Sequence, residues 1–315
     1  MSATVSSSAD VKAKQVAYHD WEARTYDDKF SISYDERCIV YARERMEKVV
    51  DPARTFGRTL EVGAGTGFFS INLWQAGFLT GEVHVSDISP GMLEVCERNA
   101  RQHGLDVVPQ VGDVEALPYD DDRFDLVIGH AFLHHLPDPQ VALAEMFRVL
   151  APGGELVVAG EPTLWGDRIA NQVKRNTYRA IVGVTALPGV RRLRKDPAGK
   201  RYSDVEAAVA ALEHEVDLHT FDPDAVQAMA RAVGFPTPTV VTEELVSNWM
   251  GWVWRTVEGS LRPGTLGRRW ALSGYRGYLV LNALDEKVLG RLVPRRLFYN
   301  LILHAVKPPR PAAIG

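Results

Sequence analysis

The sequence LEVGAGTG, residues 60–67, gives the clearest indication of the fold. Its first residues are apolar enough for a buried strand. Its glycines, Gly63, Gly65 and Gly67, let the backbone turn tightly and let a ligand approach without a Cβ in the way. Ligands of open α/β sheets bind outside the carboxyl ends of the strands. The stretch therefore predicts a strand, a ligand-binding loop and a helix, in that order.

The spacing of these glycines differs from the dinucleotide-binding fingerprint. That fingerprint is G-x-G-x-x-G, and its third glycine lies over a pyrophosphate. Here the pattern is G-x-G-x-G, and the residue three positions after Gly65 is Phe68. A phenyl ring at that position crowds a pyrophosphate, so the loop favours a ligand without phosphate there and disfavours a nicotinamide dehydrogenase.

Aspartates end the next two apolar runs. Asp87 closes EVHVSD (82–87), 20 residues after Gly67, where a carboxylate can accept hydrogen bonds from both hydroxyls of a ribose. An isolated aspartate at a strand end is more often a helix cap, but the preceding glycine loop favours the ribose role. Asp113 closes VVPQVGD (107–113) and either accepts from an adenine amino group or lies in a surface loop.

Apolar runs alternate with helical patterns through the first half of the chain. The runs are TLEVGA (59–64), EVHVSD (82–87), VVPQVGD (107–113), FDLVIGH (124–130) and ELVVAGE (155–161), and the helical patterns cover 69–75, 90–103 and 139–150. Runs rich in Val, Ile and Leu are typical of strands buried on both faces. Strand and helix in repeated alternation predict an α/β fold with a doubly wound parallel sheet.

These motifs together resemble the class I S-adenosylmethionine-dependent methyltransferases, and most of all the branch that includes the ubiquinone and menaquinone C-methyltransferases. The resemblance is carried by LEVGAGTG, VSDISPGMLEVC, GDVEALPYDDDRFDLVIGHAFLHHLPDP and ALAEMFRVLAPGGELVV, which span about residues 59–161. The motifs occur in order and at the spacing of one fold. The resemblance does not reach 163–220 or 245–293, where we expect the specificity for the methyl acceptor to lie.

The resemblance implies S-adenosylmethionine as the cofactor, S-adenosylhomocysteine as its product, and a set of contacts. Glu61, Gly63, Ala64, Gly65 and Gly67 would hold the methionine part, Asp87 the ribose, Ile88 and Met92 the adenine pocket, and Asp113 and Val114 the adenine. His130 would lie beside the reacting sulfonium. Tyr26 would close over the cofactor from an N-terminal helix.

The fold that follows is a Rossmann-like sheet of seven strands with an N-terminal helical lid and helical insertions after strand five and between strands six and seven. Strands at 237–244 and 297–307 complete the sheet, and a helix at 222–235 precedes the first of them. The predicted ranges are 1–50 (lid), 51–162 (cofactor-binding core), 163–220 (basic helical insertion), 221–244 (core helix and strand six), 245–293 (Trp-rich helical insertion) and 294–315 (strand seven and tail).

Three residues are candidates for catalysis. The protein chiefly positions the acceptor in methyl transfer from a sulfonium, but an alcohol or phenol acceptor also benefits from a general base. Histidine titrates near neutral pH, and His134 and His135 follow the fourth predicted strand. His135 can instead pack and hydrogen-bond the loop, and His134 can lie on the exposed side of a short helix. Glu161, after the fifth strand, can contact the acceptor or act as the base.

The spacing H-x-x-x-H-H at residues 130–135 also suggests a metal site. No carboxylate from a second strand is placed to complete such a site, so we expect no metal. The two cysteines, Cys38 and Cys96, form neither a disulfide framework nor a zinc pattern. The chain shows no signal peptide and no apolar stretch long enough to span a membrane. We therefore expect a cytoplasmic protein, and the oligomeric state is left open.

The acceptor is expected to be a small molecule. The nucleic-acid N-methyltransferases of this superfamily carry Asn/Asp-Pro-Pro-aromatic after the fourth strand, but this chain has HAFL at 130–133, so we expect no nucleic acid. Two alternatives to a small-molecule O- or C-methyltransferase remain. One is a sugar or polyketide O-methyltransferase of secondary metabolism, and the other is a non-catalytic module that binds the cofactor.

Charge and aromatic content suggest an acceptor that is lipid-like or anionic. Residues 1–164 carry 14 Lys and Arg against 26 Asp and Glu, whereas residues 165–315 carry 22 against 14. Trp249, Trp252 and Trp254 lie near Arg255, Arg262, Arg268 and Arg269 in the sequence. These residues either build a core over the sheet or form an apolar pocket with a basic rim. The second arrangement suits a long-chain acceptor with an anionic end, or peripheral contact with an anionic membrane.

Overall fold

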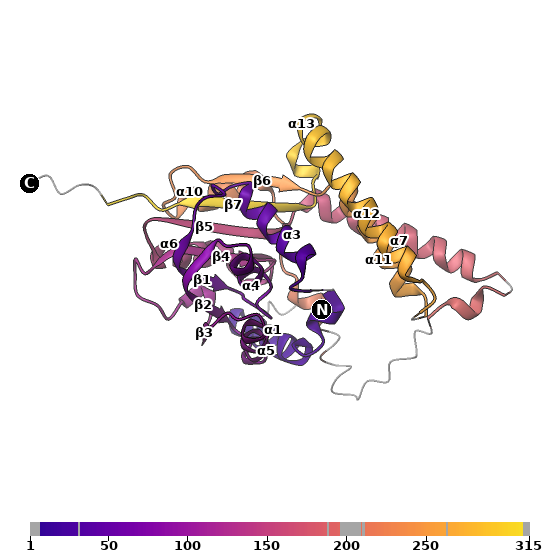
Figure 1. Cartoon of the computed structure of the whole chain (residues 1–315), viewed down its shortest axis with the longest axis horizontal. Helices are drawn as coiled ribbons and strands as arrows, with labels where there is room; N and C mark the ends of the chain where they lie inside the picture. The colour runs from indigo at the N-terminus through magenta and orange to yellow at the C-terminus, as the bar shows by residue number, and fades with distance from the viewer. Residues whose placement is uncertain are drawn as a thin grey trace, which may run out of the picture. The chain divides into compact units, whose positions relative to one another are not determined.

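A seven-stranded sheet is the central element of the structure, a computed structural model that describes residues 7–30, 32–187, 189–195, 209, 212–262 and 264–310. The strand order is β3-β2-β1-β4-β5-β7-β6 (Figure 1). The strands are β1 (Phe56–Val62), β2 (Leu79–Asp87), β3 (Val107–Val111), β4 (Phe124–His130), β5 (Leu150–Pro162), β6 (Thr239–Glu243) and β7 (Asn300–Val306). Pairs β1–β2, β2–β3, β1–β4 and β4–β5 are parallel. The predicted Rossmann-like fold is confirmed.

Helices precede and connect the strands. They are α1 (Ser8–Glu22), α2 (Tyr26–Phe30), α3 (Glu36–Glu47), α4 (Phe68–Gln75), α5 (Pro90–Gln102), η1 (Val114–Ala116), η2 (Leu133–His135), α6 (Pro139–Val149), α7 (Leu164–Thr185), η3 (Arg191–Leu193), α9 (Glu213–Val216), α10 (Pro223–Ala232), α11 (Val246–Ser260), α12 (Arg268–Leu284), η5 (Asp285–Leu289), α13 (Gly290–Leu292) and η6 (Arg295–Leu297). Within the described residues, no helix is long and apolar enough to cross a membrane.

Strand β5 is longer than the sequence predicted. It was expected to begin at residue 155, but it begins at Leu150, and its register against β4 shifts between the partners of Phe124 and Leu126. The shift absorbs the Ala151–Gly154 turn inside the strand, where Gly153 takes a φ of 82°. Strand β4 begins and ends as predicted because its apolar run is fully buried, with Leu126, Val127 and Ile128 at 0% exposure.

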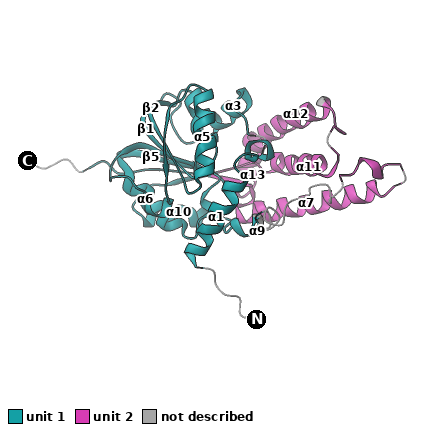
Figure 2. Cartoon of the chain, turned by 90° about the horizontal axis from the view of Figure 1, so that it is seen from below, with its two compact units in different colours: residues 1–161, 204–241, 302–315 teal, residues 162–203, 242–301 magenta. Residues whose placement is uncertain are grey.

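The chain divides into two compact units (Figure 2). Unit 1 comprises residues 1–161, 204–241 and 302–315, and it includes the N-terminal helices and most of the sheet. Unit 2 comprises residues 162–203 and 242–301, and it includes α7, α11 and α12. The six ranges predicted from the sequence remain a prediction. Residues 188, 196–208, 210 and 211 of the predicted basic insertion lie outside the described residues.

Unit 2 is built on helix α11, which packs against both α7 and α12. The buried carboxylate of Asp285 accepts hydrogen bonds from the backbone N–H of Leu245 (2.9 Å) and of Ser247 (3.0 Å), so a side chain from η5 caps the start of α11. Trp254 of α11 stacks on Trp270 of α12 with their ring centroids 4.5 Å apart. Two aromatic rings therefore hold the α11–α12 contact.

Candidate active site

Of the three glycines in the loop after β1, only Gly65 borders open space. Gly63, Gly65 and Gly67 all have positive φ angles, of 58°, 52° and 87°. A Cβ on Gly63 would lie 2.5 Å from Phe132, and one on Gly67 would lie 2.7 Å from the sulfur of Cys96. A Cβ on Gly65 would meet nothing within 4 Å. Packing therefore requires glycine at 63 and 67, while Gly65 leaves its backbone accessible to a ligand.

Two buried carboxylates flank this loop. Glu61 is 2% exposed, and it accepts a hydrogen bond from the backbone N–H of Ser70 (3.1 Å). Burial raises the pKa of Glu61 to about 7. Asp87 accepts from the N–H of Gly65 (2.8 Å) and of Ser89 (2.9 Å), and burial raises its pKa as well. The loop therefore offers two carboxylates that would gain from a hydrogen-bonding or cationic ligand.

The predicted adenine-side residues lie at the ends of β2 and β3. The N–H of Gly112 donates to the carbonyl of Asp87 (3.0 Å), which brings the two strand ends together. Met92 is buried, and Tyr26 packs against the small cluster that contains it. Ile88 is half-buried and Val114 is buried at the start of η1. These four residues remain predictions for the cofactor.

Asp113 has a partner that the sequence did not reveal. Its carboxylate lies 2.6 Å from the Nζ of Lys12, on helix α1, and it also accepts from the backbone N–H of Glu115 (2.9 Å). Lys12 contacts Glu115 too, at 2.5 Å. Any contact between Asp113 and an adenine amino group must therefore share this carboxylate with Lys12.

Residues from the N-terminal segment contact the glycine loop and the start of α5. The hydroxyl of Tyr34 donates to the carbonyl of Thr66 (2.9 Å), and Asn99 donates to the same carbonyl (3.1 Å). The carboxylate of Asp20 accepts from the N–H of Gly91 (2.8 Å) at the start of α5. Sequence reasoning proposed Tyr26 for this region and missed Tyr34 and Asp20, because contacts between distant segments leave no local pattern.

His130 lies in an aromatic cluster at the end of β4. Its Nε2 is 3.3 Å from the hydroxyl of Tyr41, and its ring centroid is 5.1 Å from that of Phe68 and 5.4 Å from that of Phe69. The phenyl ring of Phe68, which was expected to crowd a pyrophosphate, therefore packs against the end of β4. The role of His130 beside a sulfonium remains a prediction.

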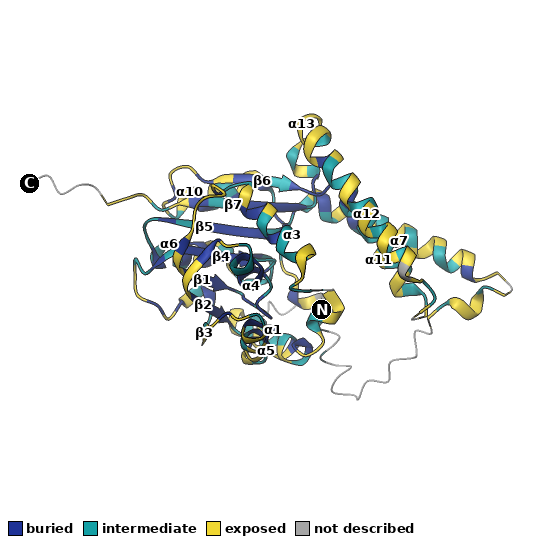
Figure 3. Ribbon diagram, viewed as in Figure 1, coloured by how far each residue is buried: buried dark blue, intermediate teal, exposed yellow. Residues whose placement is uncertain are grey.

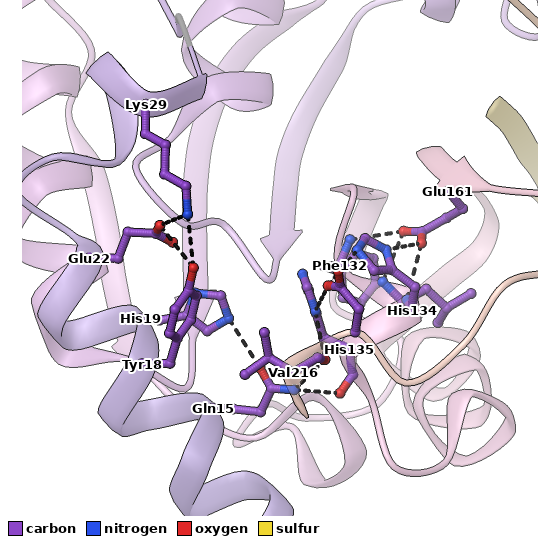
Figure 4. Close-up of polar contacts among 12 residues, drawn as sticks. Gln15, Tyr18, His19, Glu22, Lys29, Phe132, His134, His135, Glu161 and Val216 are labelled. Atoms are coloured by element: carbon purple, nitrogen blue, oxygen red, sulfur yellow. Dashed lines mark hydrogen bonds and ion pairs between the residues drawn. The ribbon is translucent and has the colours of Figure 1, made fainter. Parts of the chain in front are cut away.

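Glu161 and His134 form a buried pair (Figure 4). Glu161 is fully buried, and its Oε2 lies 2.7 Å from Nδ1 of His134. The backbone N–H groups of Phe132, Leu133 and His134 also donate to this carboxylate, at 2.9, 2.9 and 3.1 Å. Burial opposes ionisation of Glu161, but His134 and the N–H donors outweigh it and hold the pKa below its usual value. The ionised carboxylate keeps the proton of His134 on Nδ1, so Nε2 is the basic atom.

His135 lies beside His134, with the two ring centroids 4.0 Å apart, and it contacts a segment far along the chain. Its Nδ1 donates to the carbonyl of Val216 (3.0 Å) and lies 3.2 Å from Asp217. Burial, together with the neighbouring rings of His134 and His19, lowers the pKa of His135 well below its usual value. Gln15 of α1 donates to the same Val216 carbonyl (2.8 Å), as Figure 4 shows. His135 is therefore a neutral imidazole that links η2 to α9.

The same cluster contains three groups that could bind a metal ion. Ligand atoms of His134, His135 and Asp217 all lie within 4.8 Å of one another. Asp217 comes from the segment after α9 rather than from a strand, so the sequence pattern could not include it. The expectation of no metal remains a prediction, because a His-His-carboxylate set is also a common ligand set for zinc.

Comparison with known proteins agrees with this geometry. Residues 60–158 match the family described as "Methyltransferase domain". This chain contains a methyltransferase domain. The domain resembles the demethylmenaquinone methyltransferases of Anoxybacillus flavithermus, with 34% identity over 45% of this chain and 61% of that protein, and of Staphylococcus aureus, with 43% identity over 45% and 58%. The predicted recognition of the superfamily and of its quinone branch is confirmed for this domain.

The matches to these curated relatives leave more than half of this chain unmatched. The matches cover about three-fifths of the relatives' length, so they describe the methyltransferase domain rather than either protein as a whole. Among solved structures, a phosphoethanolamine N-methyltransferase of Haemonchus contortus matches with a TM-score of 0.54 and 15% identity over 92% of this chain and 60% of that one. Identity this low supports the shared fold alone.

Proposed function

We propose that this protein is an S-adenosylmethionine-dependent methyltransferase. The observation that carries the proposal is the open backbone at Gly65 between the buried carboxylates of Glu61 and Asp87. A carboxylate whose pKa is raised by burial gains from an ammonium group, which suits Glu61 to the methionine end of the cofactor. Asp87 suits the ribose hydroxyls. The bound cofactor supplies a methyl group that is already activated on a sulfonium.

Cofactor binding should depend on pH through Glu61. Because its pKa is raised to about 7, Glu61 is mostly protonated at about pH 6, and binding a cationic ammonium then requires loss of that proton. We expect S-adenosylhomocysteine to bind about five- to tenfold more weakly at about pH 6 than at about pH 7.5. Titration calorimetry across this range measures the effect. Glu61→Gln serves as the control, and an equally steep pH dependence in that variant would contradict the assignment.

We propose His134 as the general base. The ionised Glu161 fixes the tautomer that leaves Nε2 basic, and three N–H donors fix the carboxylate in turn. Removal of a phenol or alcohol proton by Nε2 generates the nucleophile for attack on the methyl group. A deprotonated hydroquinone is nucleophilic at oxygen and at the neighbouring ring carbon, so one base serves O- or C-methylation. His135 instead holds the loop through Val216.

For the acceptor we propose a lipophilic small molecule with an anionic or ionisable end. The relatives are described as acting on demethylmenaquinone and, in a rice protein that is 29% identical over 52% of this chain and 51% of its own length, on 2-methyl-6-phytyl-1,4-hydroquinone. Both names describe an aromatic ring with a long apolar chain. Nucleic acid is disfavoured because Phe132 is buried beneath the glycine loop, where base N-methyltransferases carry a proline-rich motif.

Transfer of labelled methyl groups tests this proposal. The purified full chain is incubated with methyl-labelled S-adenosylmethionine and with a prenylated hydroquinone, a sugar-decorated polyketide or duplex DNA. We expect label in the hydroquinone only, and none when Asp87→Ala replaces the wild type. Label in the polyketide alone would favour the secondary-metabolism alternative. Binding of S-adenosylhomocysteine without transfer to acceptors from a cell extract would favour the non-catalytic module.

A further inference from the structure

Unit 2 concentrates the positive charge of the chain. Its residues, 162–203 and 242–301, include 19 Lys and Arg against 7 Asp and Glu, a net charge of +12. The residues of unit 1 include 17 against 33, a net charge of −16. The moderate total of −4 therefore hides a strongly basic unit. Charge of this density attracts anionic surfaces and repels a second copy of itself.

A pocket between α7 and α11 gathers part of this charge around an aromatic ring. It has a volume of about 410 Å³, and it is lined by Lys174, Arg175, Tyr178, Trp252, Arg255 and Thr256. The ammonium of Lys174 lies 3.4 Å from the ring centroid of Trp252, and the guanidinium of Arg255 lies 5.5 Å from it. No carboxylate is among the lining residues. The pocket is therefore suited to an anion.

Trp252 supplies the aromatic ring of this pocket. Its Nε1 is buried and has no hydrogen-bond partner within the described part of the chain. That atom has almost no exposed surface, so the donors that a ligand in the pocket can reach are the cationic side chains. Phosphate oxygens accept from ammonium and guanidinium donors alike. The pocket thus combines three cationic side chains with an aromatic ring and no carboxylate.

The helices of unit 2 also expose large apolar side chains. Among residues 269–284 of α12 none is buried, as the yellow and teal ribbon in Figure 3 shows. Leu272, Tyr275 and Leu279 share one helical stripe by their i, i+3, i+7 spacing, and they are 43%, 39% and 46% exposed. Val280 is 70% exposed. A helix that is basic and carries such a stripe is typical of proteins that lie on a lipid surface.

We propose that unit 2 binds the surface of an anionic membrane and that the pocket around Trp252 takes the phosphate of a lipid headgroup. Soluble phosphate would satisfy the pocket but leave the α12 stripe exposed. A second copy packed through its own unit 2 would cover the stripe but bring two charges of +12 together, and one packed through its unit 1 would set the apolar stripe against a unit with a net charge of −16. An anionic bilayer supplies both the phosphate and the apolar layer. This proposal does not depend on methyl transfer, since it concerns binding alone.

Co-sedimentation of the full chain with vesicles tests the proposal. We expect binding to phosphatidylcholine vesicles that contain phosphatidylglycerol, and little binding to phosphatidylcholine alone. Arg255→Glu should weaken binding about 25-fold, since each basic residue near an anionic surface contributes about fivefold and a reversal counts twice. Val280→Ser should weaken it by a smaller factor without changing net charge. Both positions are exposed, so folding should be preserved, and circular dichroism checks this.

A matched control places the same charge change in unit 1. Arg101 lies on α5 with a side chain that is 74% exposed and pairs only loosely with Glu97, at 3.6 Å. Arg101→Glu should bind vesicles as the wild type does. Equal losses for Arg101→Glu and Arg255→Glu would overturn the proposal, as would equal binding to neutral vesicles. Release from vesicles by inorganic phosphate or by stoichiometric duplex DNA would also overturn it, because the pocket would then be a general anion site.

Discussion

Asp87→Ala should weaken the binding of S-adenosylmethionine by ~100-fold or more. A hydrogen bond to a charged group contributes about 1.5–3 kcal/mol, and Asp87 is proposed to accept two of them from the ribose. Loss of about 3 kcal/mol corresponds to ~100-fold in Kd. The substitution also removes the acceptor of the Gly65 N–H, at the one glycine of the loop that faces open space. Titration calorimetry with S-adenosylmethionine measures the change.

Two further variants separate binding from folding. Asp106→Ala removes an exposed aspartate just before β3, and it should leave the affinity unchanged. Asp87→Asn keeps one oxygen acceptor, so its affinity should lie between those of Asp87→Ala and the wild type. Thermal unfolding of each variant shows whether the fold is intact. A folded Asp87→Ala protein that binds the cofactor as well as the wild type would show that the ribose lies elsewhere, and tight binding of NADH would contradict the proposed ligand class.

The parts of the site that were predictable are local in sequence. The glycine loop, Asp87 and Asp113 each end an apolar run, and parallel strands bring those ends to one edge of the sheet. The spacing of apolar residues and the turn-forming glycines were therefore enough to place these residues. The largest departure within the sheet is β5, where Gly153 carries the turn inside the strand instead of before it. A bulge depends on the partner strand, so the strand's own sequence did not indicate it.

The contacts that were not predictable join distant segments. Lys12 meets Asp113, Tyr34 meets Thr66, and His135 meets the carbonyl of Val216. Each partner lies on a helix or a loop whose own pattern gives no sign of the contact, because a single long-range ion pair or hydrogen bond leaves no periodicity. Unit 2 shows the same limit. Composition predicted its basic and aromatic character and offered a core or a pocket as alternatives, but it did not indicate which tryptophan takes which role: Trp254 stacks on Trp270, whereas Trp252 lines the pocket.

Glu161→Gln should lower kcat by ~10²–10⁴-fold, the usual contribution of a general base, while cofactor affinity is retained. The glutamine oxygen can still accept from the N–H groups of Phe132 and Leu133. Its amide nitrogen then faces Nδ1 of His134, which must accept a hydrogen bond and so carries its proton on Nε2. The backbone N–H of His134 loses its acceptor, while those of Phe132 and Leu133 still hold the side chain, and the atom proposed to remove the acceptor's proton is no longer basic.

The pH profile distinguishes this tautomer effect from a structural loss. The lowered pKa of Glu161 keeps the wild-type carboxylate ionised at neutral pH, so the acid limb of kcat reports protonation of the imidazole. That limb should disappear in Glu161→Gln and in His134→Ala, whereas a variant that is merely destabilised keeps it at lower amplitude. His135→Ala should retain the limb, since His135 holds the loop through Val216. Full turnover in both histidine variants would mean that neither is the base, and the proton would then have to leave the acceptor by another route.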